Sequence, residues 1–556
     1  MESGTELPAE PAVPVKPVIA KLTVSGTTAA LLPILSETHS PMACRCLRIL
    51  PLMIALVFSD TAPVVAAEER PGEGESWYSI EFEGQRVGYE WVRTTLQPGK
   101  RSEAGPAGTP KMLLRERRTL LQLQRSGAKV SLAAVLVTSE APNGLLQSWE
   151  LTRTAADGSR IHRRGTWDDS RRAMKIEDLS GTAPTQVFVD APSQPFSPIF
   201  TEWLGQAAAA EDFPRTLPVL FPESAVAAEV EIQSSGKTAI ELTGGSRTPA
   251  RRLLWLPIAA PGLKTRVFLA ADSSRCLLVE QPLLGGTLRL IRSSPEAALG
   301  LDSQQTLDLQ LQSLLPVTGQ IPMPIPETGL RLRLTSSSPS PYSIASTDFQ
   351  TVEFQDSDGI MLICRPPKWE KPGLLLPGES RIQVAAQAEY LVSGRWIDHA
   401  DPAVQRLSNA AGARSGSTAE RCRKLSAFVH RRLQFSAFTT QLQPASRVAA
   451  KLQGDCTEHT VLLCALLRDR GIPARAASGF AYVPQLTAFA PHLWTEALVD
   501  GVWMPLDSTI PQEAPMPLLL KAADSSLNDD LSGSVSLFAP LLPLCGHVSI
   551  TVLNAD

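Results

Sequence analysis

The apolar residues of this chain follow two different periods, and the change between them limits the folds that it can adopt. From Trp77 onward apolar and polar residues alternate, as at Tyr78, Ile80 and Phe82, which is the period of a strand with one buried face. After Asp401 the apolar positions recur every three or four residues, which is the period of an amphipathic helix. The sequence therefore predicts an array of strands followed by a helical region.

A chain of 556 residues is long enough for roughly three domains. Alternating runs continue to about Ser293, so residues 68–310 are predicted to form a β-rich N-terminal domain. A Pro-rich connector, LLPVTGQIPMPIPETG, leads to a second β-rich segment, which we place at residues 311–398. Residues 399–556 form the third part, in which a helical region is followed by a C-terminal tail.

Residues 1–67 are predicted to be an upstream extension followed by a signal peptide. Arg45 and Arg48 flank the apolar run LRILPLMIALVFS, and the small residues APVVAA follow. This is the pattern of a secretory signal, around residues 42–67, and it predicts an exported protein of the periplasm, the cell envelope or the medium. The run contains Pro51 and holds only about a dozen apolar residues, so a membrane anchor is the weaker interpretation and no stable span is expected.

Composition excludes several classes of partner and cofactor. A net charge of −4 and a pI near 6.1 give no reason to expect nucleic acid. No C-x-x-C motif follows the signal, which weakens zinc and thioredoxin-like interpretations, and we expect no metal and no cofactor. The oligomeric state is left undetermined. The six cysteines after the signal are scattered, so no dense disulfide framework is expected, although single pairs stay open: Cys276, Cys364, Cys422, Cys456, Cys464 and Cys545.

Two helices are marked by their capping residues. Asp401 precedes Pro402 and the run ends before Gly412, which predicts an N-cap, a first helical residue and a C-terminal stop. The next helix opens with the capping box Ser417-x-x-Glu420. Within it Cys422, Leu425, Val429 and Leu433 share one face, so Cys422 is predicted to lie in the core.

A third helix carries the most informative cysteine. It is predicted to run from Cys456 to about Arg470, with Gly471 at its end. In the first turn, free backbone N–H groups and the helix dipole favour an anion, so we expect the pKa of Cys456 to fall. Cys464 lies two turns deeper among leucines and is expected to be an inert core thiol. A buried structural cysteine is the competing interpretation of Cys456.

A hairpin downstream supplies an imidazole and a carboxylate. Asp500-Gly501 is a strong two-residue turn signal, and a turn centred there places His492 opposite Thr509. Asp507 then lies on the same sheet face, diagonal to His492 at roughly 7–8 Å by backbone, within reach of a side-chain hydrogen bond. A register slip of one residue would separate the two. These residues are consistent with a thiol triad.

The motifs GDCTEHTVLLCALLRDRGIPAR and HLWTEALVDGVWMPLDST closely resemble the transglutaminase-like core of the papain-like superfamily. The resemblance covers about Ala400 to Ile510. It implies an α+β fold in which a nucleophile helix packs on an antiparallel sheet, preceded here by β-rich domains as in bacterial members. It implies that Cys456 is the nucleophile, His492 the general base and acid, and Asp507 the residue that orients the imidazole.

The resemblance also implies a thioester intermediate formed on an amide or peptide carbonyl. The acyl group then passes to water, as in a protease or amidase, or to an amine, as in cross-linking, and we expect hydrolysis of a protein or peptide substrate. The alternative is a non-catalytic envelope scaffold with a transglutaminase-like platform. The stretch VPQLTAFAP before His492 is interpreted as a loop that shapes a substrate cleft.

Other polar residues near these motifs are open to simpler interpretations. His459 and Cys456 have the spacing of a metal pair, but no further ligands with suitable spacing are evident. His430 is expected to be solvated. Trp494 shares a strand face with His492 and fits either an acyl site or a core, and no role is derived for Glu496 on the same face.

Overall fold

The computed structural model describes most of the chain after residue 73. The expected signal segment lies outside the described residues. The described ranges are 23–24, 27–28, 74–98, 111–125, 128–154, 160–179, 184–197, 214–222, 226–242, 247–258, 264–273, 275–283, 286–300, 308–337, 342–356, 359–369, 384–435, 442–528 and 537–553.

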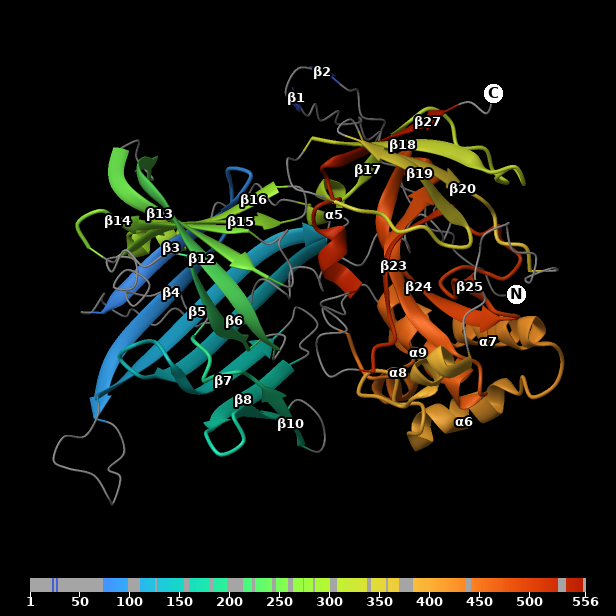
Figure 1. The fold of residues 1–556 in the computed structure, drawn as a ribbon, viewed down its shortest axis with the longest axis horizontal. Coiled ribbons are helices and arrows are strands. Elements are labelled where there is room, and N and C mark those ends of the chain that lie inside the picture. The colour runs from blue at the N-terminus through green and yellow to red at the C-terminus, as the bar shows by residue number, and fades with distance from the viewer. Residues whose placement is uncertain are drawn as a thin grey trace, which may run out of the picture.

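Two lobes make up these residues, and each is organised around one large sheet (Figure 1). The first lobe, blue to green, has a 14-stranded sheet, and the second, yellow to red, has a 9-stranded sheet. Outside them, β1 (Thr23–Val24) pairs with β2 (Thr27–Thr28). The strands of the first sheet are β3 (Glu75–Phe82), β4 (Gln85–Pro98), β5 (Lys111–Arg125), β6 (Ala128–Glu140), β7 (Leu146–Thr154), β8 (Arg160–Asp168), β9 (Ala173–Asp178), β10 (Thr185–Asp190), β11 (Arg215–Phe221), β12 (Val226–Glu241), β13 (Arg247–Pro257), β14 (Thr265–Ala270), β15 (Cys276–Leu283) and β16 (Gly286–Ser293).

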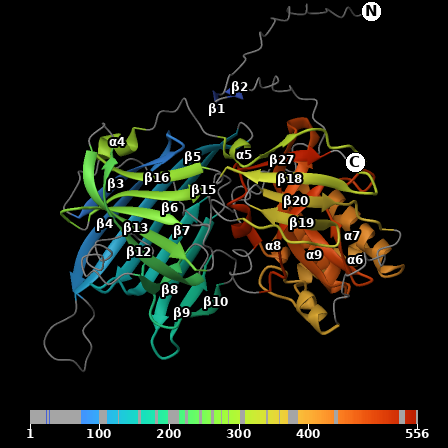
Figure 2. The ribbon, with the colours of Figure 1, turned by 45° about the horizontal axis from the view of Figure 1, so that its top comes forward.

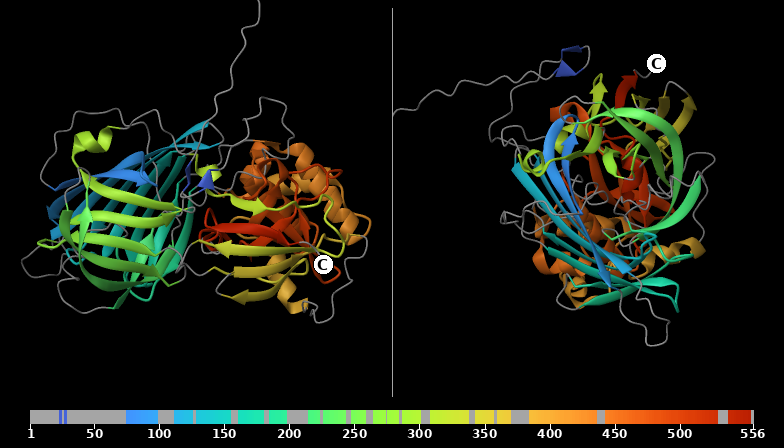
Figure 3. Two further views of the ribbon diagram at one scale, coloured as in Figure 1. Left: turned by 90° about the horizontal axis from the view of Figure 1, so that it is seen from above. Right: turned by 90° about the vertical axis from the view of Figure 1, so that its left-hand side faces the viewer.

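The first sheet is a fully antiparallel meander that starts in its middle. The chain runs outward from β3 to β10, continues at the opposite edge with β11, and returns to β16, which pairs with β3. Phe196 forms backbone bridges to Leu145, just before β7, and to Val219 in β11, so the segment after β10 links the two halves of the sheet. The sheet is strongly curved (Figure 3). β3 and β4 form a hairpin that turns at Glu83-Gly84, and both turn residues have positive φ, 48° and 76°.

The second sheet joins segments that are far apart in the sequence. Its order is β19-β20-β18-β27-β17-β24-β23-β26, with β25 on β24. Figure 2 shows β27 beside β18, with β20 and β19 beyond it. The strands are β17 (Leu315–Thr318), β18 (Leu330–Ser336), β19 (Gln350–Asp356), β20 (Gly359–Cys364), β23 (Ala474–Val483), β24 (Ala488–Val499), β25 (Val502–Leu506), β26 (Leu519–Ser525) and β27 (Val548–Leu553).

The second β-rich segment is therefore not separate from the part that follows it. β17, inside the expected Pro-rich connector, pairs antiparallel with β24 and parallel with β27. β27 also pairs antiparallel with β18, so the expected C-terminal tail is an internal strand of the sheet. Residues 311–398 and 399–556 share one sheet, which the sequence did not reveal because pairing between distant strands leaves no local pattern.

Helices cover one side of β23 and β24. The N-cap at Asp401, the capping box of Ser417 and Glu420, and the end of the first helix at Gly412 are confirmed. The remaining short elements include β21 (Gln434–Phe435), which pairs with β22 (Gln453–Gly454). The helices are α4 (Pro295–Leu299), α5 (Leu309–Gln312), α6 (Pro402–Ala411), α7 (Thr418–Arg432), α8 (Ala445–Lys451) and α9 (Cys456–Asp469), and the 3-10 helices are η2 (Val384–Leu391), η3 (Pro484–Leu486) and η4 (Ala539–Leu541).

The helix α9 is the centre of the second lobe. β23 and β24 pack on one side of it, and α6, α7 and α8 pack on the others. Every residue from Cys456 to Arg468 is consequently buried. In the described ranges no helix is long and apolar enough to cross a membrane. The six cysteines among these residues are free thiols, and all six are buried.

The position of β27 leads to a prediction about stability. Ile550 is 0% exposed and pairs with Val317 on one side and Leu334 on the other. We expect Ile550→Ala to lower the free energy of unfolding of the second lobe by about 2–5 kcal/mol. The truncated side chain would leave a cavity in β27, the strand that lies between β17 and β18.

Urea denaturation followed by circular dichroism measures this change. Ser549→Ala is the matched control, because Ser549 is exposed on the same strand and should change stability by less than about 0.5 kcal/mol. Equal effects of the two substitutions would show that β27 is not an integral strand of the lobe.

Candidate active site

Cys456 is the first residue of α9, and its neighbours cap the helix. Asp455 is the N-cap: its side chain accepts a hydrogen bond from the Thr457 N–H at 3.0 Å. Glu458 Oε2 accepts from the Asp455 N–H at 3.0 Å, which completes a capping box. A Cβ at Gly454 would lie 2.3 Å from Glu458 Cβ, so only glycine fits before this box.

The thiol of Cys456 does not have the lowered pKa that the sequence analysis expected. Its residue is 0% exposed, and burial raises the pKa of the thiol well above its ordinary value. The carboxylate of Asp455 raises the pKa further, a backbone hydrogen bond from Leu493 acts against this, and Asp507 and Glu458 add smaller increases. Cys464 is also buried, with its pKa raised to about 11. Both thiols of α9 are therefore neutral at rest.

His492 and Asp507 form the pair that the hairpin register predicted. Val499 pairs with Val502 and Thr495 with Leu506, which is the expected register, and Asp500 and Gly501 both have positive φ, 52° and 88°. His492 Nε2 lies 2.7 Å from Asp507 Oδ2, and both side chains are buried. Because a carboxylate only accepts hydrogen bonds, Nε2 carries the proton and donates it.

The other imidazole nitrogen, Nδ1, differs from Nε2 in its surroundings. Nδ1 of His492 is buried, and among the described residues it has no hydrogen-bond partner. A proton on Nε2 leaves the lone pair on Nδ1 of a neutral ring. This nitrogen can therefore accept a proton from a neighbouring acid.

An interruption in strand pairing brings the thiol to this pair. One edge of β24 pairs with β17 at residues 488–489 and with β25 at residues 495–499, so neither strand pairs with residues 490–494. Cys456, at the tip of α9, reaches the backbone N–H of Leu493 there, which is the residue after His492. The structure thus brings Cys456, His492 and Asp507 together, although no direct hydrogen bond joins the thiol to the imidazole among the described contacts.

Asp507 is fixed by the residues that follow it. Its Oδ1 accepts hydrogen bonds from the N–H of Thr509 at 2.9 Å and from the Thr509 hydroxyl at 2.6 Å. Burial acts to raise the pKa of Asp507, but His492 and these bonds outweigh burial, so the pKa lies below its ordinary value. Asp507 is therefore held as a carboxylate.

Two histidines hold Ser508, the neighbour of Asp507, and sequence reasoning missed both roles. Nδ1 of His459, on α9, lies 3.2 Å from Ser508 Oγ. Nδ1 of His430, on α7, lies 3.1 Å from the Ser508 carbonyl oxygen, so His430 is half-buried and bonded to the backbone where simple solvation was expected. Two helices thereby fix the backbone beside the carboxylate. The position of His459, three residues after Cys456, was the only sequence signal that could have indicated these contacts.

Glu496 has a role that the sequence did not reveal. Its Oε2 accepts hydrogen bonds from Arg475 Nε at 2.7 Å and from Lys521 Nζ at 2.7 Å. Asp524 pairs with the same two cations, at 3.1 Å and 2.8 Å. This network joins β23, β24 and β26 on the face of β24 that carries His492.

The stretch VPQLTAFAP is mostly strand, which corrects its interpretation as a cleft-shaping loop. β23 extends to Val483, η3 spans Pro484–Leu486, and β24 begins at Ala488. The run from Ala488 to Pro491 is buried in the sheet. Only the short turn at residues 484–487 remains exposed. The small and aromatic residues that alternate from Ala488 onward fit a paired strand.

The described part of the chain holds no group of three or more His, Cys, Asp or Glu side chains that could bind a metal ion. The imidazole of His459, considered as a partner of Cys456 in a metal pair, instead lies within hydrogen-bonding distance of the Ser508 hydroxyl.

Comparisons with known proteins identify part of the chain. Residues 405–508 match the profile of the transglutaminase-like superfamily. No curated protein matches the chain. Similar solved structures include a candidate cysteine protease from Cytophaga hutchinsonii, with 15% identity, 41% of this chain and 87% of that chain covered and a TM-score of 0.27.

Two further structures are similar to a comparable extent. A β-barrel-like protein of a domain of unknown function from Brucella abortus has 8% identity, 40% and 95% coverage and a TM-score of 0.28. The periplasmic domain of TgpA from Pseudomonas aeruginosa, bound to ethylmercury, has 19% identity, 34% and 74% coverage and a TM-score of 0.24. With TM-scores this low, the family match alone assigns residues 405–508.

The lowered pKa of Asp507 leads to a pH-dependent prediction. A carboxyl with a depressed pKa stabilises the fold above its unfolded-state pKa, and that contribution is lost as pH falls through the folded-state pKa. We expect Asp507→Asn to be less stable than the wild type at about pH 7, with a difference that shrinks below about pH 4.

Urea denaturation across this pH range measures the difference. Asp500→Asn is the control on the same hairpin, since asparagine also favours the positive φ of that turn. A difference for Asp507→Asn that persists unchanged in acid would contradict the stabilised carboxylate.

Proposed function

Because residues 405–508 match the profile of the transglutaminase-like superfamily, we propose that this chain is a cysteine enzyme that acts on amide or peptide carbonyls. Catalysis is assigned to the second lobe, with Cys456 as nucleophile, His492 as general base and acid, and Asp507 as the orienting carboxylate. The observation that carries the proposal is the ring of His492, whose Nε2 is bonded to Asp507 and whose Nδ1 is left without a partner beside the start of α9.

The first half-reaction carries one proton from the thiol through His492 to the leaving amine, forms an S–C bond and breaks a C–N bond. Nδ1 of His492 takes the proton from the Cys456 thiol as the sulfur attacks the carbonyl carbon. The imidazolium that forms is stabilised by Asp507, which keeps its charge. Nδ1–H then protonates the leaving amine nitrogen, the C–N bond breaks, and a thioester remains on Cys456. Because the resting thiol is neutral, proton removal by His492 is required for attack.

The developing oxyanion needs hydrogen-bond donors near Cys456. The side chain of Asp455 already accepts from the N–H groups of Thr457 and Glu458. The N–H of Cys456 is the first-turn amide that the capping box does not use, and we assign it to the oxyanion. It lies at the positive end of the dipole of α9.

Water or an amine completes the second half-reaction. We propose hydrolysis of a protein or peptide substrate, in which water attacks the thioester with His492 as base and Cys456 regains its proton. Amine transfer uses the same thioester. We also propose that the protein is exported, on the pattern of the segment around residues 42–67.

A non-catalytic scaffold is the second candidate, and one observation favours it. Cys456 and His492 are each 0% exposed, so a substrate reaches the thiol only if the surrounding structure opens. A scaffold with a closed platform needs no such opening. The complete hydrogen bonding of Asp507, in contrast, favours the enzyme, because a platform gains nothing from an oriented imidazole.

Trapping of the acyl-enzyme tests the function. We expect incubation with p-nitrophenyl acetate and acid quenching to add one acetyl group at Cys456, located by peptide mass spectrometry. Cys456→Ala should abolish the adduct, and Asp507→Asn should slow its formation by about 10²-fold or more, because the imidazole loses its orientation.

Cys464→Ala is the matched control on the same helix and should leave the adduct unchanged. Added cadaverine then distinguishes hydrolysis from amine transfer by the product released. An unmodified Cys456 in the wild type, or equal labelling of Cys464, would support the scaffold.

The contacts of Ser508 lead to a prediction about positioning. Ser508→Ala removes the bond to His459 but keeps the carbonyl that bonds His430, so Asp507 should lose part of its support. We expect kcat to fall about 3- to 10-fold with little change in KM, because the effect acts on orientation and not on binding.

Steady-state kinetics with the substrate identified by trapping measure this split. Ser508→Thr retains the hydroxyl and should restore most of the rate. A rise in KM with unchanged kcat would place Ser508 in substrate binding, and no effect in either constant would remove it from the supporting structure.

A further inference from the structure

A cavity lies behind the candidate triad, on the face of β24 that carries His492, Trp494 and Glu496. Its volume is about 410 Å³, which is within the range of small-molecule sites, roughly 300–1,000 Å³. β24 and the chain after β25 form two sides and α7 contributes a third. The segments that flank β19 and β20, together with residues 323–325 after β17, form the rest. Asp507 and Trp494 line the cavity, whereas Cys456 and His492 do not.

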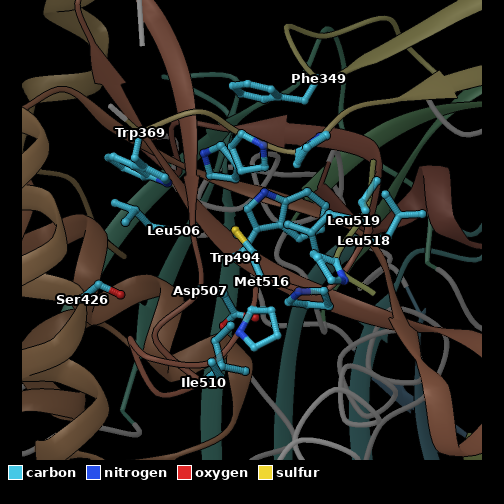
Figure 4. A pocket seen from close by; sticks show the side chains of 18 of the residues that line it. Phe349, Trp369, Ser426, Trp494, Leu506, Asp507, Ile510, Met516, Leu518 and Leu519 are labelled. Carbon is cyan, nitrogen blue, oxygen red and sulfur yellow. The ribbon is translucent and has the colours of Figure 1, made fainter. Parts of the chain in front are cut away.

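The wall of the cavity is mainly apolar, with one buried donor that lacks a partner. Figure 4 shows Trp494 between Phe349 and Asp507, with Met516 beside it. Trp494 is 2% exposed, and among the described residues its Nε1 has no hydrogen-bond partner. A buried N–H without a partner is uncommon in proteins, so a ligand with an acceptor oxygen fits this position.

The charges around the cavity favour an anion. Three of its charged residues are already paired: Glu496 and Lys521 with each other, and Asp507 with His492. Arg365 and Arg423 also line it and are half-buried. Arg365 Nη1 donates to the Thr351 hydroxyl at 3.4 Å, and within the described part of the chain neither arginine has a carboxylate at ion-pair distance. Two guanidinium groups thus remain available for a ligand carboxylate.

We propose that this cavity binds a free carboxylate that is attached to a large apolar or aromatic group and a neighbouring carbonyl. The carboxylate pairs with Arg365 and Arg423, the apolar group packs between Phe349 and Trp369, and the carbonyl accepts from Trp494 Nε1. A C-terminal aromatic residue of a peptide and an N-acylated aromatic amino acid share this chemistry.

The site is separate from the thioester chemistry proposed above, because the nucleophile does not line it. A ligand there contacts Trp494, whose ring stacks on His492 with centroids 6.3 Å apart, and Asp507, which orients the same ring. The ligand therefore binds against two neighbours of the imidazole without occupying the thiol. Binding can be measured without turnover, so its failure leaves the proposed activity untouched.

Isothermal titration calorimetry on the full chain tests the proposal. The probes are N-acetyl-phenylalanine, the peptide Ala-Ala-Ala-Phe with a free C-terminus, and the C-terminal amides of both. We expect the free acids to bind at least tenfold more tightly than the amides, because only the acids pair with the arginines. Binding should persist in Cys456→Ala.

Variants then identify the contacts. Arg423→Gln should weaken binding of the free acid at least fivefold and leave the amide unchanged. Arg431→Gln is the matched control on α7, because Arg431 is exposed and does not line the cavity. Trp494→Phe keeps an aromatic ring beside His492 and removes the N–H, and should weaken the acid about fivefold, a typical effect of one lost hydrogen bond.

Each outcome decides the proposal. Tighter binding of the peptide acid identifies a peptide C-terminus as the ligand, and binding of the small acid alone identifies a free N-acyl amino acid. Equal affinities for acid and amide, no heat with any probe, or loss of binding in Cys456→Ala would each overturn the proposal, the last because the ligand would then lie at the thiol.

Discussion

The second lobe depends on the complete burial of α9. The sheet and three helices enclose this helix, so its first-turn N–H groups have no water and must find partners within the protein. Asp455 accepts from two of them, the N–H groups of Thr457 and Glu458, and the Glu458 side chain accepts from the N–H of Asp455. Gly454 leaves space for the Glu458 side chain. The same burial determines where the thiol lies, because the tip of α9 meets β24 where one edge of that strand, at residues 490–494, is paired with neither β17 nor β25.

The carboxylates that cap α9 oppose the ionisation of the Cys456 thiol. The carboxylates that cap the helix disfavour a thiolate, and burial adds to their effect on the pKa of the thiol. A neutral thiol is a weak nucleophile, so reactivity depends on a base that removes its proton during attack. His492 meets this requirement, because Asp507 fixes its tautomer and Thr509 and Ser508 fix Asp507. The thiol thus stays protonated at rest beside a charged Asp507, and attack relies on proton transfer to His492.

The sequence predicted the parts of the fold that depend on local chemistry. The caps at Asp401 and Ser417 and the register around Asp500-Gly501 follow from residue types that favour one backbone conformation, and all are present. The pairing of β27 with β17 and β18 brings together segments more than 200 residues apart, for which alternation gives no partner. The partners of Glu496 and Ser508 likewise come from other elements. The pKa of Cys456 was mistaken because the helix terminus was considered without the burial around it.

The most direct test compares the alkylation rates of Cys456 and Cys464 by iodoacetamide at about pH 7, in the wild type and in His492→Gln, by mass spectrometry. The two thiols share α9, are fully buried and have raised pKa values, so they differ mainly in access to the imidazole. We expect Cys456 to react faster than Cys464 and to lose this lead in His492→Gln, while the rate of Cys464 is unchanged. Equal rates that do not depend on His492 would contradict it.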